Sequence, residues 1–140
     1  MQIKLEHIGI VAKDFDKSLK IYQDLLGLEI AGIEEVELEG DLYKVAFLPV
    51  GEPEVELVYT TADTGIAGDF LREKGEGIHH LAFEVDDIES YYKRLSERGV
   101  KFVYDGIKDG SRGTRVFFFA PEEFNGIYIE IVQKKKATNQ

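Results

Sequence analysis

The second half of this chain repeats the first, so its fold has to be built from two similar units. Residues 7–14 (HIGIVAKD) return as residues 80–87 (HLAFEVDD), an offset of 73, and residues 55–58 (VELV) return as residues 129–132 (IEIV), an offset of 74. Each copy therefore carries one histidine near its start and one glutamate near its end. The period is too long for a solenoid repeat, which indicates a duplicated module.

Hydrophobic periodicity predicts the same order of elements, β-α-β-β-β, in both halves. Asp14 and Gly27 supply the N-cap and C-cap of the first helix, and Asp87 and Gly99 do so for the second. The predicted strands cover residues 4–11, 28–36, 42–49, 54–60, 78–85, 101–104, 114–119 and 127–133. We expect one domain over residues 1–140, with a first module (about 3–61), a linker helix (about 62–75) and a second module (about 77–133).

The period-two geometry of strands decides which way the repeated polar side chains point. Glu56 and Glu130 each lie between two apolar residues and therefore face the opposite side of their strand. In an α+β fold whose curved, mixed sheet carries its helices outside, these glutamates line the concave side. His7 and His80 follow the same logic, whereas the adjacent His79 is expected to face the other way, either as a structural residue or as one that supports a site residue. The sequence thus predicts a cup with four polar side chains inside.

Composition excludes several classes of function. The chain has no cysteine, which rules out disulfides, thiolate metal ligands and thiol nucleophiles. Its net charge of -10 argues against nucleic acid or an anionic membrane as a partner. No apolar run is long enough to span a membrane, and the charged start is unlike a signal peptide, so a cytoplasmic protein is expected. A polyanionic ligand would need a local basic patch, and the candidates are Lys101, Lys108, Arg112 and Arg115. Residues 134–136 (KKK) are interpreted as a solvated tail.

Two histidines and two glutamates at one point would make a metal site. Taken singly, a glutamate in a strand is usually solvated and a histidine is usually structural. The matching offsets favour the metal interpretation, because both residue types recur at equivalent places. Two nitrogen and two oxygen donors without sulfur suit Zn²⁺, Co²⁺, Ni²⁺ or Mn²⁺, with positions left open for water or substrate. The sequence does not choose among these ions.

Four further segments are informative, 45–51 (VAFLPVG), 65–71 (GIAGDFL), 75–88 (GEGIHHLAFEVDDI) and 126–133 (GIYIEIVQ). In these segments the chain resembles the methylmalonyl-CoA epimerases, and over residues 7–133 it resembles their superfamily, the vicinal oxygen chelate (glyoxalase/bleomycin resistance/dioxygenase) proteins. The run with Gly-x-Gly-x-His-His is fairly specific, whereas the Ile-Glu-Ile ending is common to the superfamily. The resemblance implies paired βαβββ modules around one divalent metal, with cobalt favoured. The ligands that it implies are His7, Glu56, His80 and Glu130.

The resemblance also implies a reaction, the interconversion of (R)- and (S)-methylmalonyl-CoA by proton abstraction at C2 through a metal-stabilised enolate. Glu130 is the first catalytic base that it implies. A second catalytic glutamate of the family aligns with Lys44. This lysine is the candidate for the second role if its pKa is lowered by desolvation, and the alternative, which the sequence favours, is a plain solvated strand residue. Residues 58–61 (VYTT) and 119–121 (FAP) depart from the family pattern and leave room for a different substrate.

Two other functions remain open at this point. Glyoxalase I, or a related metal-dependent lyase or isomerase, uses the same kind of ligand set. A non-catalytic binding module of the same fold would lack the ligand set that this chain retains. For the epimerase, the expected partners are a small-molecule acyl-CoA, with its CoA near residues 101–115, and a second copy of the chain in a homodimer.

Overall fold

Eight strands form one mixed sheet in the order β2-β3-β4-β1-β5-β8-β7-β6. The structure, a computed structural model, describes residues 3–135. The strands are β1 (Lys4–Val11), β2 (Gly32–Leu38), β3 (Asp41–Pro49), β4 (Glu54–Thr60), β5 (Gly77–Glu84), β6 (Lys108–Asp109), β7 (Arg115–Phe119) and β8 (Tyr128–Gln133). The helices are α1 (Phe15–Leu26), α2 (Gly65–Lys74) and α3 (Ile88–Glu97), with short 3₁₀ helices η1 (Ser111–Gly113) and η2 (Pro121–Glu123).

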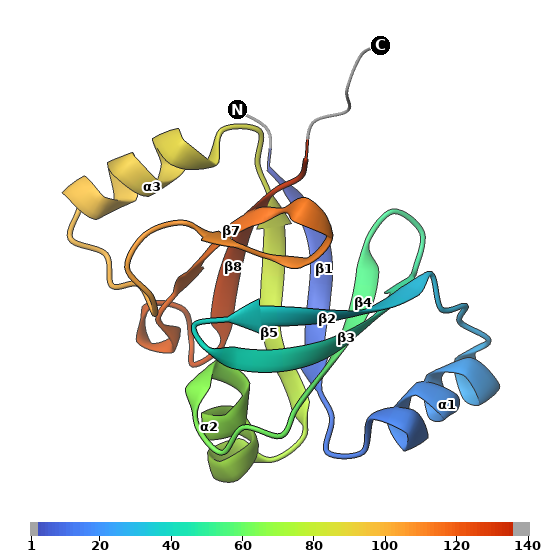
Figure 1. The fold of residues 1–140 in the computed structure, drawn as a ribbon. Helices are drawn as coiled ribbons and strands as arrows, with labels where there is room; N and C mark the ends of the chain where they lie inside the picture. The colour runs from blue at the N-terminus through green and yellow to red at the C-terminus, as the bar shows by residue number, and fades with distance from the viewer. Residues whose placement is uncertain (1–2, 136–140) are drawn as a thin grey trace.

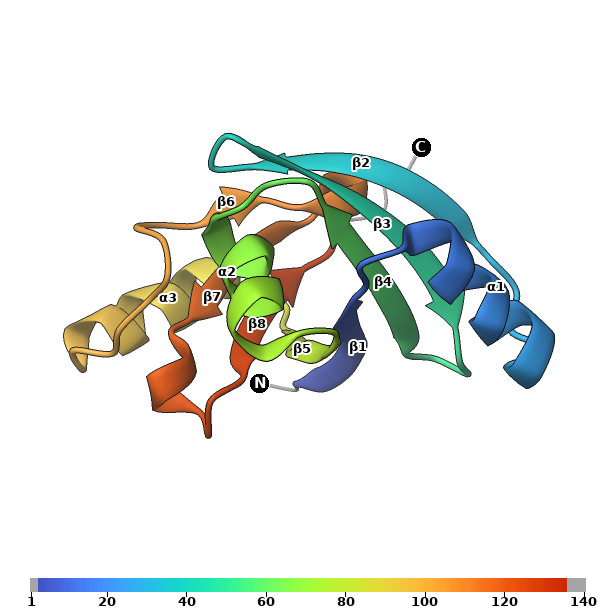
Figure 2. The same cartoon turned by 90° about the horizontal axis from the view of Figure 1, so that it is seen from below.

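The two halves of the sheet have the same internal pairing, which confirms the predicted duplication. β1 pairs in parallel with β4, and β5 pairs in parallel with β8. The halves join where β1 and β5 run antiparallel along the middle of the sheet. In Figures 1 and 2 the outer strands of both halves curve toward each other, so the sheet forms a cup with α1 and α3 outside it. The cupped α+β architecture expected from the sequence is confirmed.

The predicted caps start the first helix of each module. The Asp14 carboxylate accepts a hydrogen bond from the backbone N–H of Lys17, and the Asp87 carboxylate accepts one from Ser90. Gly27 ends α1 with a φ of 69°, in the left-handed region that glycine adopts without strain. Within residues 3–135, no helix is long and apolar enough to cross a membrane.

Strands β3, β4, β7 and β8 are buried on both faces, which fixes the direction of their side chains near the cup. On β3, Tyr43, Val45 and Phe47 pack inside the cup against α2 and the second module. The alternate residues Ala46 and Leu48 pack outside, under α1. β7 follows the same rule, with a second outer core under α3. Because strands alternate with period two, a residue next to an inward side chain faces outward unless a bulge intervenes.

One predicted strand is wrong. Residues 101–104 contribute only a single bridge, between Phe102 and Phe119. The ring of Phe102 stacks on Tyr92 of α3, and a turn at Gly106 (φ 86°) then redirects the chain. The edge strand forms instead at β6, which is followed by η1. The aromatic and β-branched residues that suggested a strand serve packing under α3.

Candidate active site

Two β-bulges in the central strand pair place four polar side chains inside the cup. Between β1 and β5 the register skips Glu6 on one strand and His79 on the other, so neither has a partner across the pair. A bulge turns two consecutive side chains toward one face. Glu6 and His7 are accordingly both buried, as are His79 and His80. The expectation that His79 faces away from His80 is therefore wrong, because it assumed an unbroken strand.

The structure brings together all four residues that the repeat singled out. Nε2 of His7 lies 3.0 Å from Nε2 of His80, and Oε1 of Glu130 lies 3.2 Å from each of these nitrogens. Glu56 approaches from β4, with Oε2 2.9 Å from Nδ1 of His7. Each module thus contributes one histidine and one glutamate to a single buried cluster.

Close packing against Gly9 fixes the orientation of the His80 ring. Gly9 lies opposite His80 in the β1–β5 pair, and a Cβ at this position would come closer than 3.0 Å to three atoms of the imidazole. The ring therefore occupies the space that any larger residue on β1 would fill. This glycine is required for close approach of a ring and not for an unusual backbone angle.

The hydrogen bonds of the bulged residues decide which nitrogen of each histidine faces the centre. Burial lowers the pKa of His79 to about 4, so its ring is neutral. Its Nε2–H donates to the Ile66 carbonyl at 2.9 Å, which leaves Nδ1 to accept from Nδ1 of His80 at 2.8 Å. Glu6 accepts from Nδ1 of His7 at 2.5 Å. Both inner nitrogens, Nε2 of His7 and of His80, therefore face each other with their outer nitrogens already committed.

Charge in the cluster is divided unequally between the two imidazoles. Burial lowers the pKa of His7, but the charge of Glu130 and the nearby carboxylates of Glu56 and Glu6 outweigh it and hold that pKa well above 6.5. Burial, with the neighbouring His79 and His7, lowers the pKa of His80 well below 6.5. These opposite shifts favour a proton on Nε2 of His7 that is directed at the unprotonated Nε2 of His80. A cation between the two nitrogens would take the place of that proton.

The residues present fit a divalent metal ion. Two imidazole nitrogens and a carboxylate oxygen separated by 3.0–3.2 Å match the spacing of ligands that share an ion at bonds of about 2.0–2.2 Å. The proton on His7 Nδ1 is directed at Glu6, so Oε2 of Glu56, although near, has no hydrogen-bond partner among the described residues. Burial raises the pKa of Glu56. A buried carboxylate oxygen without a partner is costly, and a cation would satisfy it.

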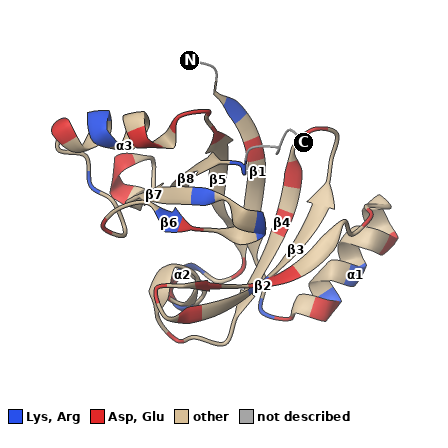
Figure 3. Ribbon diagram, turned by 45° about the horizontal axis from the view of Figure 1, so that its top comes forward, with Lys and Arg blue, Asp and Glu red and all other residues tan. Residues whose placement is uncertain are grey.

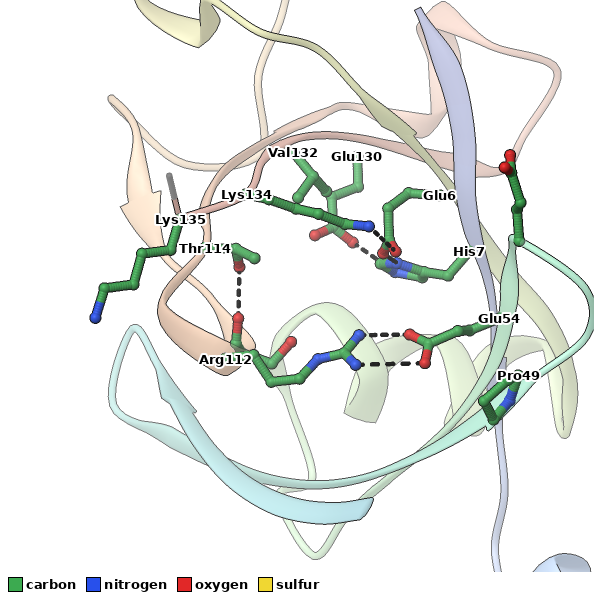
Figure 4. A pocket seen from close by; sticks show the side chains of 12 residues that line it. Glu6, His7, Pro49, Glu54, Arg112, Thr114, Glu130, Val132, Lys134 and Lys135 are labelled. Atoms are coloured by element: carbon green, nitrogen blue, oxygen red, sulfur yellow. Dashed lines mark hydrogen bonds and ion pairs between the residues drawn. The ribbon is translucent and has the colours of Figure 1, made fainter. Parts of the chain in front are cut away.

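The cluster opens into a polar cavity of about 360 Å³ on one side and a smaller, largely apolar cavity of about 80 Å³ on the other. Figure 4 shows the polar cavity, with His7 and Glu130 at its base and Arg112 reaching across to Glu54. Lys134 corrects the expectation of a wholly solvated tail, because its Nζ lies 3.4 Å from carboxylates of both Glu6 and Glu84. Lys136 lies outside the described residues.

The structure does not bring Lys44 to the other four predicted site residues. Lys44 alternates with the inward Tyr43 and Val45, so it faces the outside of the sheet. Its Nζ lies 4.7 Å from the centre of the Phe15 ring of α1. Sequence reasoning missed Glu6 as part of the site, and it placed His79 on the wrong face of its strand. They occupy equivalent positions, 73 residues apart, directly before the two histidines, and that shared offset was the signal that could have found them.

Most of the basic residues proposed as an anion-binding patch are paired within the protein. Lys108 Nζ lies 2.9 Å from Glu39, and Arg115 lies 2.6 Å from Glu89. Arg112 pairs with Glu54 at the polar cavity. Figure 3 shows acidic positions along β4 and basic positions on the segment around β6 beside it. The patch is therefore largely neutralised by neighbouring carboxylates, and only its Arg112 lies beside the cluster.

Comparisons with known proteins agree with the resemblance drawn from the sequence. The profile of the Glyoxalase/Bleomycin resistance protein/Dioxygenase superfamily matches residues 6–118. Human mitochondrial methylmalonyl-CoA epimerase is 29% identical over 131 residues, which cover 93% of this chain and 73% of that protein. The ethylmalonyl-CoA/methylmalonyl-CoA epimerase of Cereibacter sphaeroides is 30% identical over 132 residues, covering 93% and 97%. A structure of a Streptomyces coelicolor methylmalonyl-CoA epimerase variant in complex with 2-nitronate-propionyl-CoA has a TM-score of 0.86 at 28% identity, covering 95% and 98%.

Proposed function

This chain belongs to the Glyoxalase/Bleomycin resistance protein/Dioxygenase superfamily, and on that premise we propose that it is an isomerase, a metal-dependent epimerase of methylmalonyl-CoA. It would interconvert the (R) and (S) forms by moving the proton at C2. The observation that supports this most strongly is the cluster itself, in which His7, His80 and Glu130 place three donor atoms within 3.2 Å of one another at the base of a cavity. Relatives with epimerase names cover nearly the whole chain.

The proposed metal ligands are His7, Glu56, His80 and Glu130. Cobalt is favoured by resemblance, and zinc, nickel and manganese fit the same donor set. An ion held there would supply Lewis-acid stabilisation to the negative charge that develops on the thioester oxygen. Glu6 would keep His7 in the tautomer that presents Nε2 inward, and His79 would do the same for His80.

Glu130 is the proposed base. Its carboxylate reaches the centre of the cluster from β8 and lines both cavities, so a substrate carbon beside the ion would lie within its reach. The enolate would be shielded from water by the apolar side chains of the inner cavity. Lys44 receives no role, because it lies on the outside of the sheet. An acyl-CoA would enter from the polar cavity, where solvent reaches the cluster.

Deuterium exchange tests the proposal directly. Metal-reconstituted protein is incubated with methylmalonyl-CoA in D₂O, and label at C2 is followed by mass spectrometry, with bound metal measured in each sample. We expect rapid exchange in the wild type and a loss of about 100-fold or more in Glu130→Gln. Glu52→Gln, which removes a glutamate elsewhere in the polar cavity, is the matched control and should exchange normally.

Absence of exchange in metal-loaded wild-type protein would refute the epimerase and make adducts of methylglyoxal with thiols the next substrates to test. A Glu130→Gln variant that keeps both its metal and its exchange would refute the role of Glu130. The homodimer expected from the resemblance stays a prediction, and light scattering during size-exclusion chromatography measures it.

A further inference from the structure

Arg112 links the two modules across the mouth of the polar cavity. Its backbone N–H donates to both carboxylate oxygens of Glu34 on β2, at 3.1 and 3.2 Å. Its guanidinium donates through two nitrogens to the two oxygens of Glu54 on β4, one of them at 3.3 Å. The guanidinium carbon lies 3.8 Å from the centre of the Phe47 ring. Arg112 therefore presents a planar, preoriented fork beside the cluster.

The backbone of Arg112 is held in an unfavourable conformation to achieve this. Its φ of 52° and ψ of 36° lie in the left-handed region, which costs a non-glycine residue about 1–2 kcal/mol. Gly110 directly precedes η1 and Gly113 is its last residue, and the arginine between them also takes the left-handed conformation. The contacts with Glu34, Glu54 and Phe47 hold the arginine in place against that cost.

The pair with Glu54 has the geometry of an arginine recognising a ligand carboxylate. Glu54 and Arg112 line the same cavity as His7 and Glu130. The Glu54 side chain is 11% exposed and the Arg112 side chain 41% exposed, so the guanidinium remains open to the cavity while its partner is held by the strand. We propose that Arg112 is the receptor for the free carboxylate of the substrate, and that Glu54 is an internal competitor which occupies the fork in the absence of substrate.

The charges around the cavity favour such a receptor for a carboxylate-bearing thioester. Four carboxylates line the cavity: Glu6, Glu52, Glu54 and Glu130. They repel an entering anion. Lys134 lies within 4 Å of both Glu6 and Glu84, and Lys135 offers a point charge at the rim. Arg112 alone among these described cations combines a planar fork with an aromatic support, and its planar fork matches a carboxylate.

This inference deepens the proposed function and rests on it, and a pair of CoA thioesters separates the two. Malonyl-CoA and propionyl-CoA differ by the carboxylate, so the ratio of their affinities, measured by calorimetry on the metal-loaded protein, reports its recognition. We expect Arg112→Met to weaken malonyl-CoA binding about 10- to 100-fold, the range of a charge-assisted hydrogen bond, and to leave propionyl-CoA binding nearly unchanged. Lys135→Met removes an equal charge from the same cavity and should change the ratio far less.

Glu54→Gln should have the opposite effect on malonyl-CoA binding. An ion pair with a purely structural role would not produce that effect. Without its competitor, Arg112 should bind malonyl-CoA more tightly than in the wild type, whereas Glu52→Gln, the control for the general field, should have a smaller effect. If Arg112→Met and Glu54→Gln each weaken the binding of malonyl-CoA and propionyl-CoA equally, the Arg112–Glu54 pair only holds the loop and the inference is wrong. Arg112→Lys keeps the charge but removes the planar fork. A near-native fold with an affinity ratio between those of the wild type and Arg112→Met would support the carboxylate receptor.

Deuterium exchange by the wild-type protein distinguishes the epimerase proposal from the carboxylate-receptor proposal. Exchange in the wild type together with an unchanged affinity ratio in Arg112→Met would overturn the receptor and leave the epimerase standing. A ratio that falls as expected, in a wild-type protein that exchanges no deuterium, would support the carboxylate receptor and overturn the epimerase.

Discussion

Gly9 offers the sharpest test of the cluster, because it makes space for His80 without belonging to the site chemically. A Cβ at Gly9 would lie under 3.0 Å from Cε1, Nδ1 and Nε2 of that imidazole. Comfortable contact between non-bonded carbon atoms needs about 3.5 Å or more, so in Gly9→Ala the ring must move by more than about 0.5 Å. Metal sites tolerate ligand displacements of about 0.2 Å. The substitution therefore moves a proposed ligand out of range while leaving all four donors in the sequence.

We expect Gly9→Ala to lower the affinity for Co²⁺ or Zn²⁺ at least about 10- to 100-fold, as for substitutions that misalign a ligand. Its thermal stability without metal should fall by the equivalent of about 1–3 kcal/mol, the usual cost of overpacking a core. Competition with a chelator measures the affinity, and the cobalt absorption spectrum reports a changed ligand geometry.

Gly32→Ala is the matched control. It makes the same change in a strand, where the new Cβ would meet only a Phe47 ring carbon at 3.8 Å, an ordinary contact. Its metal affinity should equal that of the wild type. A Gly9→Ala variant with wild-type affinity and an unchanged cobalt spectrum would refute the argument that the Gly9 space fixes the ligand geometry.

Two further substitutions test the faces of the strands. Lys44→Met should leave exchange activity unchanged, because the Lys44 ammonium lies over Phe15 outside the cup, and a loss as large as that of Glu130→Gln would contradict this placement. His79→Phe removes the acceptor of the His80 Nδ1–H and the donor to the Ile66 carbonyl. It should weaken metal binding about 10- to 100-fold in chelator competition, with partial recovery in His79→Gln, and equal affinities in all three proteins would exclude an orienting role.

Strand periodicity predicts much of this site because alternation survives along most of each strand. Glu56 and Glu130 were placed inside the cup by their apolar neighbours alone, and the structure has them there. Lys44 was assigned by alignment, and the same alternation that succeeded for the glutamates places it outside. Along these regular strands, alternation therefore gives the face of all three side chains.

The bulges could not be predicted in this way. Whether a strand accommodates an extra residue depends on its pairing across the sheet, and the pairing of β1 with β5 joins residues some 70 positions apart. The left-handed conformation of Arg112 could not be predicted either, because it depends on carboxylates of β2 and β4 in the other module. The strand predicted over residues 101–104 was wrong for a related reason, because packing under α3 uses the same residue types as a strand.

Glu6 and His79 occupy equivalent positions before the two histidines. They differ in chemistry, but each accepts a hydrogen bond from Nδ1 of the histidine that follows it. Glu6 accepts the Nδ1–H of His7 directly, whereas His79 needs the Ile66 carbonyl behind it to become an acceptor for His80. Both arrangements turn Nε2 inward, but the carboxylate adds a charge that favours a cation on His7, and the neutral ring adds none to His80. The two imidazoles are therefore unequal donors in a nearly symmetric frame. A single proton between them satisfies both nitrogens but leaves Oε2 of Glu56 without a hydrogen-bond partner among the described residues, and an ion would satisfy all three.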